Sequence, residues 1–307
     1  MALPERCPLC HAGREIQAVV TRRVYGSEAA DRAFFHCSGC DVRYLFPGLT
    51  AEQEARFYAS EFEGFMAGRA GVSGGWSRIE DHIRANEPTR LRRMKYLRRY
   101  LEPPMSILEV GCSSGFMLQP LIDLGYECVG VEPSGLFSDE LRRRGIGTFQ
   151  SLKELAISDE KRRFDLIMHF FVLEHIAQPR RFFEAQLALL KPGGKIVFEV
   201  PNVADPLCSV YDIPAFERFY WSIAHPWYFS EASLRYLLEQ TGHRYEILLD
   251  QRYDLSNHMV WARDGRPGGM GRFTPALGQE LEDSYRAALV RLGRCDTLIG
   301  IMNAGRA

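Results

Sequence analysis

The stretch "ILEVGCSSGFM", Ile107 to Met117, decides the fold of this 307-residue chain. Apolar residues surround one acid, Glu109, and are followed at once by Gly111 and Gly115 with three small residues between them. A buried strand that turns directly into a helix, and leaves backbone N–H groups open to a ligand, needs small residues at the turn. The stretch therefore predicts a strand, a ligand-binding turn and a helix.

Short apolar runs alternate with helical stretches from about Met105 onward. Strands are predicted at 106–110, 127–132, 164–170 and 194–200, and helices at 116–125, 138–145, 179–190 and 230–242. This alternation implies right-handed crossovers and a mostly parallel sheet covered on both faces, which is a doubly wound α/β fold. The segment 259–264 is predicted as a final edge strand, followed by a glycine-rich loop and a closing helix.

Composition divides the chain into three regions. Residues 1–49 carry paired cysteines and strand-like pieces at 14–24 and 31–37, residues 50–104 read as a helical lid or linker interrupted by glycines at 68–76, and residues 105–307 form the α/β domain. Thr50 is a candidate N-cap with Gln53 in the following turn. An aromatic-rich insert at about 202–229 is expected to complete the lid over a substrate.

The acid before the glycine turn restricts the class of ligand. The turn differs from the dinucleotide fingerprint G-x-G-x-x-G, because Ser113 occupies the middle position and Glu109 precedes the turn. A diphosphate at a helix N-terminus does not call for a nearby carboxylate, whereas a cationic ligand does. A nucleotide-binding oxidoreductase remains the alternative interpretation of the turn taken alone.

The stretch resembles motif I of the class I S-adenosylmethionine-dependent methyltransferases, E/D-x-G-x-G-x-G. "YECVGVEPS", "FDLIMHFFVLEHI" and "LKPGGKIVFEVPN" are similar to later blocks of that family, in the family's order. The resemblance implies a seven-stranded Rossmann-like sheet that binds S-adenosyl-L-methionine. It places Glu109 near the positively charged end of the cofactor and Glu132 on both ribose hydroxyls. The implied cofactor-binding residues are Glu109, Gly111, Cys112, Ser113, Gly115, Phe116, Glu132, Pro133, Ser151, Leu152, Phe170 and Phe171.

Structural roles remain open for some of these residues. Glu132 alone could be a solvated strand end, although it follows Glu109 at the spacing expected of the two acids. Phe170 and Phe171, taken singly, are more often core residues than a cofactor cover.

Four cysteines near the N-terminus form two C-x-x-C pairs, "CPLC" with Cys7 and Cys10, and "CSGC" with Cys37 and Cys40. Two such pairs can close a tetrahedral Zn²⁺ site with no open position, which is typical of a structural ion. Disulfides or unligated thiols are the alternatives, and His11 and His36 are possible substitute ligands. Residues 1–49 with these cysteines are interpreted as a zinc-binding ribbon. The ribbon is similar to those of bacterial methyltransferases that act on sugars, cell-surface glycans and natural products, and to that of some ribosomal RNA methyltransferases.

Methyl transfer from a sulfonium is an in-line displacement that often needs a base to free the acceptor atom. His175 and His225 are the candidates, because histidine takes a proton near neutral pH. Helix capping is the alternative for His175 and packing for His225, while His169 is expected to be core. Arg78, Arg84, Arg90 and Arg92 could bind a phosphate or carboxylate handle, or form a solvated helix face.

The sequence therefore predicts O-methylation of a small molecule, a sugar or glycan precursor or a secondary metabolite. The alternatives are an RNA methyltransferase that grips RNA with the ribbon, a sugar C-methyltransferase, and a non-catalytic binding module. A formal net charge of −1 gives no basic footprint for nucleic acid or an anionic membrane. No apolar run resembles a signal sequence or a membrane span, so a cytoplasmic protein is expected. The oligomeric state is left open.

Overall fold

The computed structural model describes residues 3–27, 31–50, 52–53, 57, 64–65 and 79–306. A seven-stranded sheet forms the centre, with the strand order β10-β11-β8-β7-β4-β5-β6. Its strands from β4 to β8 are parallel, while β11 runs antiparallel to both β8 and β10. The predicted fold class is thereby confirmed. The bounds are β4 (Ser106–Val110), β5 (Glu127–Val131), β6 (Gly147–Phe149), β7 (Phe164–Phe170), β8 (Leu190–Pro201), β10 (His243–Asp250) and β11 (Thr297–Arg306).

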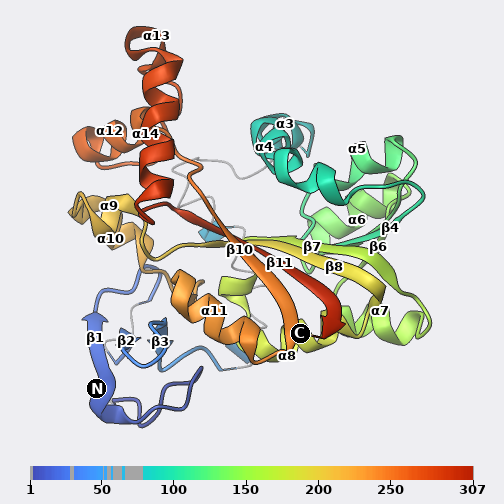
Figure 1. Ribbon diagram of the computed structural model, residues 1–307, viewed down its shortest axis with the longest axis horizontal. Helices are drawn as coiled ribbons and strands as arrows, with labels where there is room; N and C mark the ends of the chain where they lie inside the picture. The colour runs from blue at the N-terminus through green and yellow to red at the C-terminus, as the bar shows by residue number, and fades with distance from the viewer. Residues whose placement is uncertain are drawn as a thin grey trace.

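Helices cover both faces of this sheet (Figure 1). Successive residues of a strand point to opposite faces, so Leu108 and Ile107 belong to different apolar clusters. One cluster packs α7 (Leu152–Ser158), α8 (Pro179–Leu187) and α11 (Glu231–Glu239) on the sheet. The other packs α4 (Glu87–Leu97), α5 (Leu118–Asp123) and α6 (Gly135–Arg143).

The predicted edge strand at 259–264 is wrong, because these residues end the helix α12 (Leu255–Asp264). Asp254 caps that helix by accepting a hydrogen bond from the backbone N–H of Asn257, and Gly265 ends it with a φ of 62°. Val260 and Trp261 are both buried, so this apolar run faces a helical core and not a sheet. The predicted closing helix is present as α13 (Thr274–Leu277) and α14 (Gln279–Arg291), but the chain continues into the strand β11, which was not predicted.

A second sheet joins the N-terminal region to the α/β domain. After a short 3-10 turn, η1 (Arg14–Ile16), it consists of β1 (Gln17–Thr21), β2 (Ala33–Cys37), β3 (Arg43–Phe46) and β9 (Trp227–Tyr228), in that order. The first two strands occupy the strand-like pieces predicted at 14–24 and 31–37. The last strand comes from the insert at 202–229, which also contains α9 (Pro206–Ser209) and α10 (Pro214–Tyr220).

The predicted lid or linker region, residues 50–104, is mainly helical where it is described. The helices α3 (Ile79–Ala85) and α4 lead through η3 (Arg98–Tyr100) into β4. Thr50 and Gln53 exchange the reciprocal hydrogen bonds of the predicted helix cap. The predicted glycine break at 68–76 lies outside the described residues. Among the described residues, no helix combines the length and apolarity needed to cross a bilayer.

Candidate functional site

The glycine turn after β4 adopts a backbone that ordinary side chains rarely allow. Gly111, Ser113 and Gly115 have φ values of 73°, 48° and 72°. A Cβ at Gly111 would lie 2.6 Å from Cγ2 of Val172, and one at Gly115 would lie 2.6 Å from Cδ2 of Leu141. Glycine is therefore required at both positions by conformation and by packing. The turn follows the carboxyl end of a central strand, where ligands of such sheets bind.

Glu132 ties this turn to the end of β5. Its Oε2 accepts a hydrogen bond of 2.7 Å from the backbone N–H of Ser113, and its Oε1 accepts one of 2.9 Å from that of Ser134. The side chain is only 7% exposed. A carboxylate oxygen has capacity for a second donor, so both oxygens, while fixed in place, can also accept from a pair of ribose hydroxyls.

Glu109 is a buried acid at the same end of the sheet. It is 2% exposed, and no partner within hydrogen-bonding distance of its Oε2 exists among the described residues. Burial raises the pKa of Glu109 well above its usual range, the charge of Arg93 opposes this, and the charge of Glu132 adds to it. A buried acid with an unsatisfied oxygen suits the cationic end of S-adenosyl-L-methionine, so the residues present fit the cofactor.

Arg93 of α4 enters this site from the neighbouring helix and was not singled out from the sequence. Its Nε donates a 2.9 Å hydrogen bond to Oε2 of Glu199, and its guanidinium carbon lies 4.0 Å from the centre of the Phe170 ring. Arg92 forms a second ion pair with Glu199 at 2.6 Å. Burial alone would raise the pKa of the fully buried Glu199, but Arg93 and Arg92 hold that pKa below its usual value. The sequence signal was an acid inside the apolar run of β8.

The remaining cofactor candidates surround the same strand ends. Phe171 adopts a φ of 57°, and the guanidinium carbon of Arg252 lies 4.0 Å from the centre of its ring. Ser151 caps α7 by accepting from the backbone N–H of Glu154. Cys112, Phe116 and Phe170 are buried, Leu152 and Phe171 are partly buried, and Pro133 is exposed.

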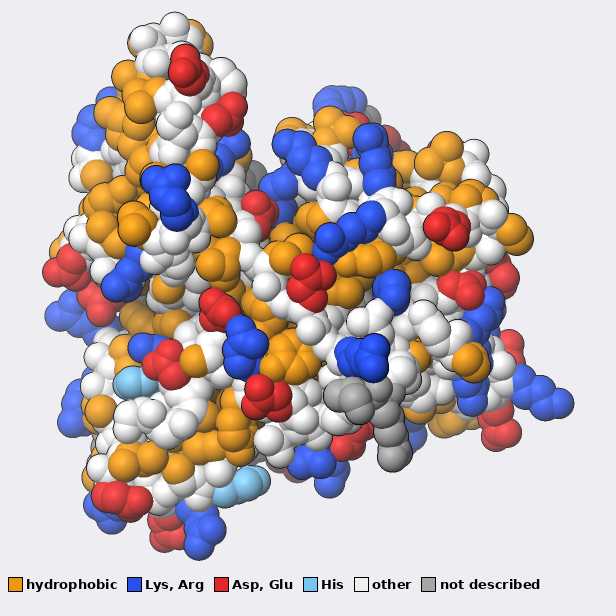
Figure 2. All heavy atoms as spheres, viewed as in Figure 1, with side chains coloured by type: hydrophobic (Ala, Val, Ile, Leu, Met, Phe, Trp, Pro, Cys, Tyr) orange, Lys and Arg blue, Asp and Glu red, His pale blue; other side chains and the backbone are white. Residues whose placement is uncertain are grey.

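The helix α3 also contacts the glycine turn. His82 of α3 is within hydrogen-bonding distance of the Ser114 hydroxyl, with 2.7 Å between Nδ1 and Oγ, and its ring lies 5.5 Å from that of Phe137. The helix α3 therefore rests directly on the glycine turn. Figure 2 shows the surface hollowed between α14 and the α3–α4 pair, with Lys and Arg side chains along the α3–α4 edge.

Of the four arginines predicted as anion handles, those described already have acidic partners. Arg84 pairs with Asp81, Arg90 with Glu87, and Arg92 with Asp250 as well as Glu199. Arg78 lies outside the described residues. His169 is fully buried and stacked on Phe198, with ring centres 4.9 Å apart, as expected for a core residue.

The structure brings His175 and His225 together. Their ring centres are 4.6 Å apart and the rings are nearly perpendicular. His175 lies in the 3-10 turn η4 (Leu173–His175) that follows β7, and its Nδ1 is 2.7 Å from the carbonyl oxygen of Ala224. A carbonyl can only accept, so Nδ1 carries the hydrogen of this contact. Glu174, which the sequence did not single out, belongs to the same cluster.

A cavity of about 280 Å³ lies beside His175, and its walls come from three parts of the chain. The N-terminal region contributes Arg6, Tyr44 and Phe46, and the loop after β7 contributes His175 and Ala177. The insert contributes Ile223, Pro226 and Trp227. Apolar walls with a few polar groups are typical of small-molecule sites. Three further aromatics of the insert, Tyr220, Trp221 and Tyr228, are buried in a core with Phe34 and do not line this cavity.

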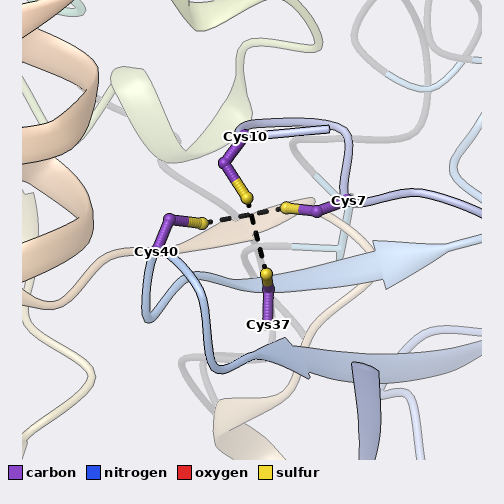
Figure 3. A group of neighbouring side chains, drawn as sticks. All are labelled: Cys7, Cys10, Cys37 and Cys40. Atoms are coloured by element: carbon purple, nitrogen blue, oxygen red, sulfur yellow. Dashed lines mark hydrogen bonds between the residues drawn. The ribbon is translucent and has the colours of Figure 1, made fainter. Parts of the chain in front are cut away.

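The four N-terminal cysteines converge on one point (Figure 3). Sγ of Cys7 lies 3.8 Å from that of Cys40, and Sγ of Cys10 lies 3.6 Å from that of Cys37. A tetrahedron with zinc–sulfur bonds of about 2.3 Å has edges of about 3.8 Å. Neither separation matches a disulfide, whose sulfurs are about 2.05 Å apart. The hydrogen bond from Cys40 lowers the pKa of Cys7 to about 5, which favours a thiolate there. The donor set therefore fits Zn²⁺.

Comparison with known proteins assigns the family. The model of a methyltransferase domain matches residues 81–246, which span β4 to β8 and their helices. The chain therefore belongs to this methyltransferase domain family. The fold and the residues of the site agree with that family.

Individual relatives share only part of their length with the chain. A ubiquinone biosynthesis O-methyltransferase of Chelativorans sp. (strain BNC1) is 30% identical over 95 residues, which is 29% of this chain and 38% of that protein. The protein of the same name from Coxiella burnetii (strain Dugway 5J108-111) is 30% identical over 117 residues, 36% of this chain and 50% of that protein. The matches thus span half or less of the relatives.

Solved structures share the fold at low identity. A methyltransferase of Archaeoglobus fulgidus aligns with a TM-score of 0.50 and 17% identity over 79% of this chain and 100% of that one. A plantazolicin methyltransferase in complex with SAH aligns with a TM-score of 0.50 and 16% identity over 82% of this chain and 95% of that one. These structures support the fold alone.

Proposed function

We propose that the protein transfers a methyl group from S-adenosyl-L-methionine to a hydroxyl group of a small molecule, a sugar or glycan precursor or a secondary metabolite. The cavity beside His175 is the observation that carries this proposal, because it lies against the loop that follows a central strand of the cofactor-binding sheet. Its volume of about 280 Å³ suits a small acceptor or part of one. The name of the O-methyltransferase relatives is consistent with an oxygen acceptor.

Each candidate residue has a separate role in the proposed reaction. When bound, S-adenosyl-L-methionine supplies an electrophilic methyl group on a sulfonium sulfur. Glu132 would hold the ribose hydroxyls, and Glu109 would face the cationic end. His175 and His225 would activate the acceptor hydroxyl, whose proton must leave as the oxygen–methyl bond forms and the sulfur–methyl bond breaks. Arg6, at the cavity wall, could hold an anionic group of the acceptor.

A structural Zn²⁺ in the cysteine cluster is part of this proposal. Tyr44 and Phe46 of β3 line the cavity, and β3 follows closely after Cys37 and Cys40. An ion that fixes the four cysteines would therefore fix one wall of the acceptor cavity. This gives the N-terminal region a role in acceptor binding without a direct role in the chemistry.

Transfer of a labelled methyl group into a fractionated cell extract tests the function. We expect label in the small-molecule or glycan fraction, in a form that hydriodic acid releases as methyl iodide, as it does from an O-methyl group. Label in RNA would overturn the proposal in favour of RNA methylation. Label that resists hydriodic acid would point to methylation of carbon or nitrogen instead.

A further inference from the structure

We propose that Glu174, His175 and His225 together bind one divalent transition-metal ion at the edge of the acceptor cavity. The binding site stands on its own geometry, while the ion's role in activating the acceptor rests on the proposed function. The site is separate from the cysteine cluster, which uses four sulfur donors from the N-terminal region.

The three side chains offer a compact ligand set. One ligand atom from each, two imidazole nitrogens and one carboxylate oxygen, all lie within 4.8 Å of one another. Ligands bonded to one ion at about 2.0–2.2 Å lie roughly 3–4 Å apart, so small side-chain rotations bring all three to a single ion. Glu174 is 1% exposed, and an ion bound to its carboxylate would offset the cost of burying that charge.

The surroundings of His175 are those of a metal ligand. A ligating histidine typically donates its second ring N–H to a carbonyl or carboxylate, which fixes the tautomer and the ring orientation. Nδ1 of His175 has this contact with the carbonyl oxygen of Ala224 at 2.7 Å, so Nε2 is the nitrogen that would coordinate an ion. Ala224 immediately precedes His225, so the same contact also positions the second histidine.

The backbone around the cluster is fixed independently of any ion. Trp227 Nε1 donates a 2.9 Å hydrogen bond to the carbonyl oxygen of Ile176, which connects the insert to the loop that carries Glu174 and His175. The backbone N–H of His225 donates to the carbonyl oxygen of Ser222 at 3.0 Å. The ligands thus come from two segments that are held together before an ion binds.

The ligand types and their number define the chemistry. Imidazole and carboxylate suit Zn²⁺, Mn²⁺ and Fe²⁺ and distinguish this cluster from a thiolate site. Three protein ligands leave positions open for water or substrate, as in catalytic sites, whereas the four cysteines leave none. His175 also lines the cavity, so an acceptor there can reach an open position.

The ion would act as a Lewis acid on the acceptor oxygen. In this arrangement His175 and His225 would activate the acceptor through the ion and not as bases. Coordination lowers the pKa of a bound hydroxyl, so its proton would pass to solvent water before or during attack. The oxygen then forms its bond to the methyl carbon as the carbon–sulfur bond breaks, and the electron pair of that bond stays on sulfur. No oxidant or reductant is needed, and the ion is unchanged at the end.

Mn²⁺ binding followed by electron paramagnetic resonance tests the site directly. Mn²⁺ is the probe because thiolates select Zn²⁺, so a zinc-loaded cysteine cluster does not take it up. We expect one Mn²⁺ per chain in the wild-type protein. His175→Gln and His225→Gln should each weaken Mn²⁺ binding roughly tenfold or more. His243→Gln, a histidine at the start of the edge strand β10, is the matched control and should bind Mn²⁺ as the wild type does.

Folding and function are separated from metal binding by two further readouts. Thermal unfolding and S-adenosyl-L-methionine affinity show whether each variant is folded and binds the cofactor. If one histidine variant is unfolded or does not bind the cofactor, the conclusion is drawn from the other. The proposed site would be overturned if the wild type binds no Mn²⁺, or if both intact variants bind Mn²⁺ as tightly as the wild type does. Methyl transfer that survives chelation would reject the ion's catalytic role alone. Mn²⁺ binding without any methyl transfer would instead count against the proposed function.

Discussion

Glu132 and Ser113 are joined by a 2.7 Å hydrogen bond from the backbone N–H of the glycine turn to the carboxylate Oε2. This contact connects the end of β5 to the turn after β4, the two places where the sheet presents ligand-binding groups. In the proposed site this side chain holds the turn in place and would also face the ribose, so it would affect cofactor binding both by direct contact and by preorganisation.

Replacing Glu132 by Gln should weaken S-adenosyl-L-methionine binding by about 10- to 100-fold, because hydrogen bonds to a charged group are each worth about 1.5–3 kcal/mol. Calorimetric titration measures the affinity. Glu127→Gln is the control, since Glu127 begins the same strand and is largely exposed in an ion pair with Arg162. Equal affinity in the two variants would show that the ribose lies elsewhere.

Cofactor affinity should depend on pH through Glu109. Burial raises the pKa of this acid, so at low pH it is protonated and neutral, and it becomes an effective partner for a cation only as pH rises. We therefore expect S-adenosyl-L-methionine affinity to increase with pH and to level off above the raised pKa. Glu109→Gln should bind more weakly at high pH and lose this dependence. A wild-type affinity that does not change with pH would contradict this placement.

The same raised pKa has a consequence for stability without cofactor. The folded protein holds the Glu109 proton more tightly than the unfolded chain does, so its contribution to stability is fully present below the usual glutamate pKa. That contribution is lost as pH rises through the raised pKa. Urea unfolding of the cofactor-free protein should show a smaller loss of stability with pH in Glu109→Gln than in the wild type.

Gly111→Ala should destabilise the glycine turn and impair cofactor binding. The φ of 73° costs a residue with a Cβ about 1–2 kcal/mol, and the new Cβ would lie 2.6 Å from Val172. Gly147→Ala is the matched control, because its Cβ would meet its nearest neighbour at 4.0 Å. Thermal unfolding and cofactor titration should separate the two variants, and equal behaviour would argue against a tight turn.

Cys37→Ser should release zinc from the cysteine cluster and lower thermal stability. The four sulfurs converge at the spacing of a tetrahedral zinc site, so the loss of one ligand should lower metal content from about one ion per chain toward zero. Elemental analysis of the purified protein measures this. Cys128 is a partly buried cysteine on β5, outside the cluster, so the Cys128→Ser protein should retain about one zinc ion per chain. A zinc-free wild-type protein that is fully stable would refute a structural ion.

The sequence predicted the elements that local patterns define and missed those that depend on distant contacts. The predicted bounds of β4 and β7 match the structure, because buried parallel strands give apolar runs bounded by turn residues. The run at 259–264 was misread because short apolar runs in helices and strands look alike. Its helical start is set by the Asp254 cap, which comes five residues before the run.

The candidate site shows the same division. The turn from Gly111 to Gly115 and the acids Glu109 and Glu132 could be located from motif and spacing. Arg93 of α4 could not, because its role depends on Glu199 of β8, which lies 106 residues further along the chain. The cavity was equally hidden, because it forms only when β3 pairs with β9.

Blocking the cavity tests the account of acceptor binding most directly. Ala177→Trp would place a large side chain at the cavity wall, while Ala188→Trp would place one at the exposed end of α8, away from the cavity. The measurement is the rate of labelled methyl transfer into serial dilutions of the small-molecule fraction, together with S-adenosyl-L-methionine affinity. We predict that Ala177→Trp raises the acceptor KM at least tenfold, about 1.4 kcal/mol, with cofactor affinity unchanged, and that Ala188→Trp behaves as the wild type. An unchanged acceptor KM in Ala177→Trp would show that the acceptor binds elsewhere.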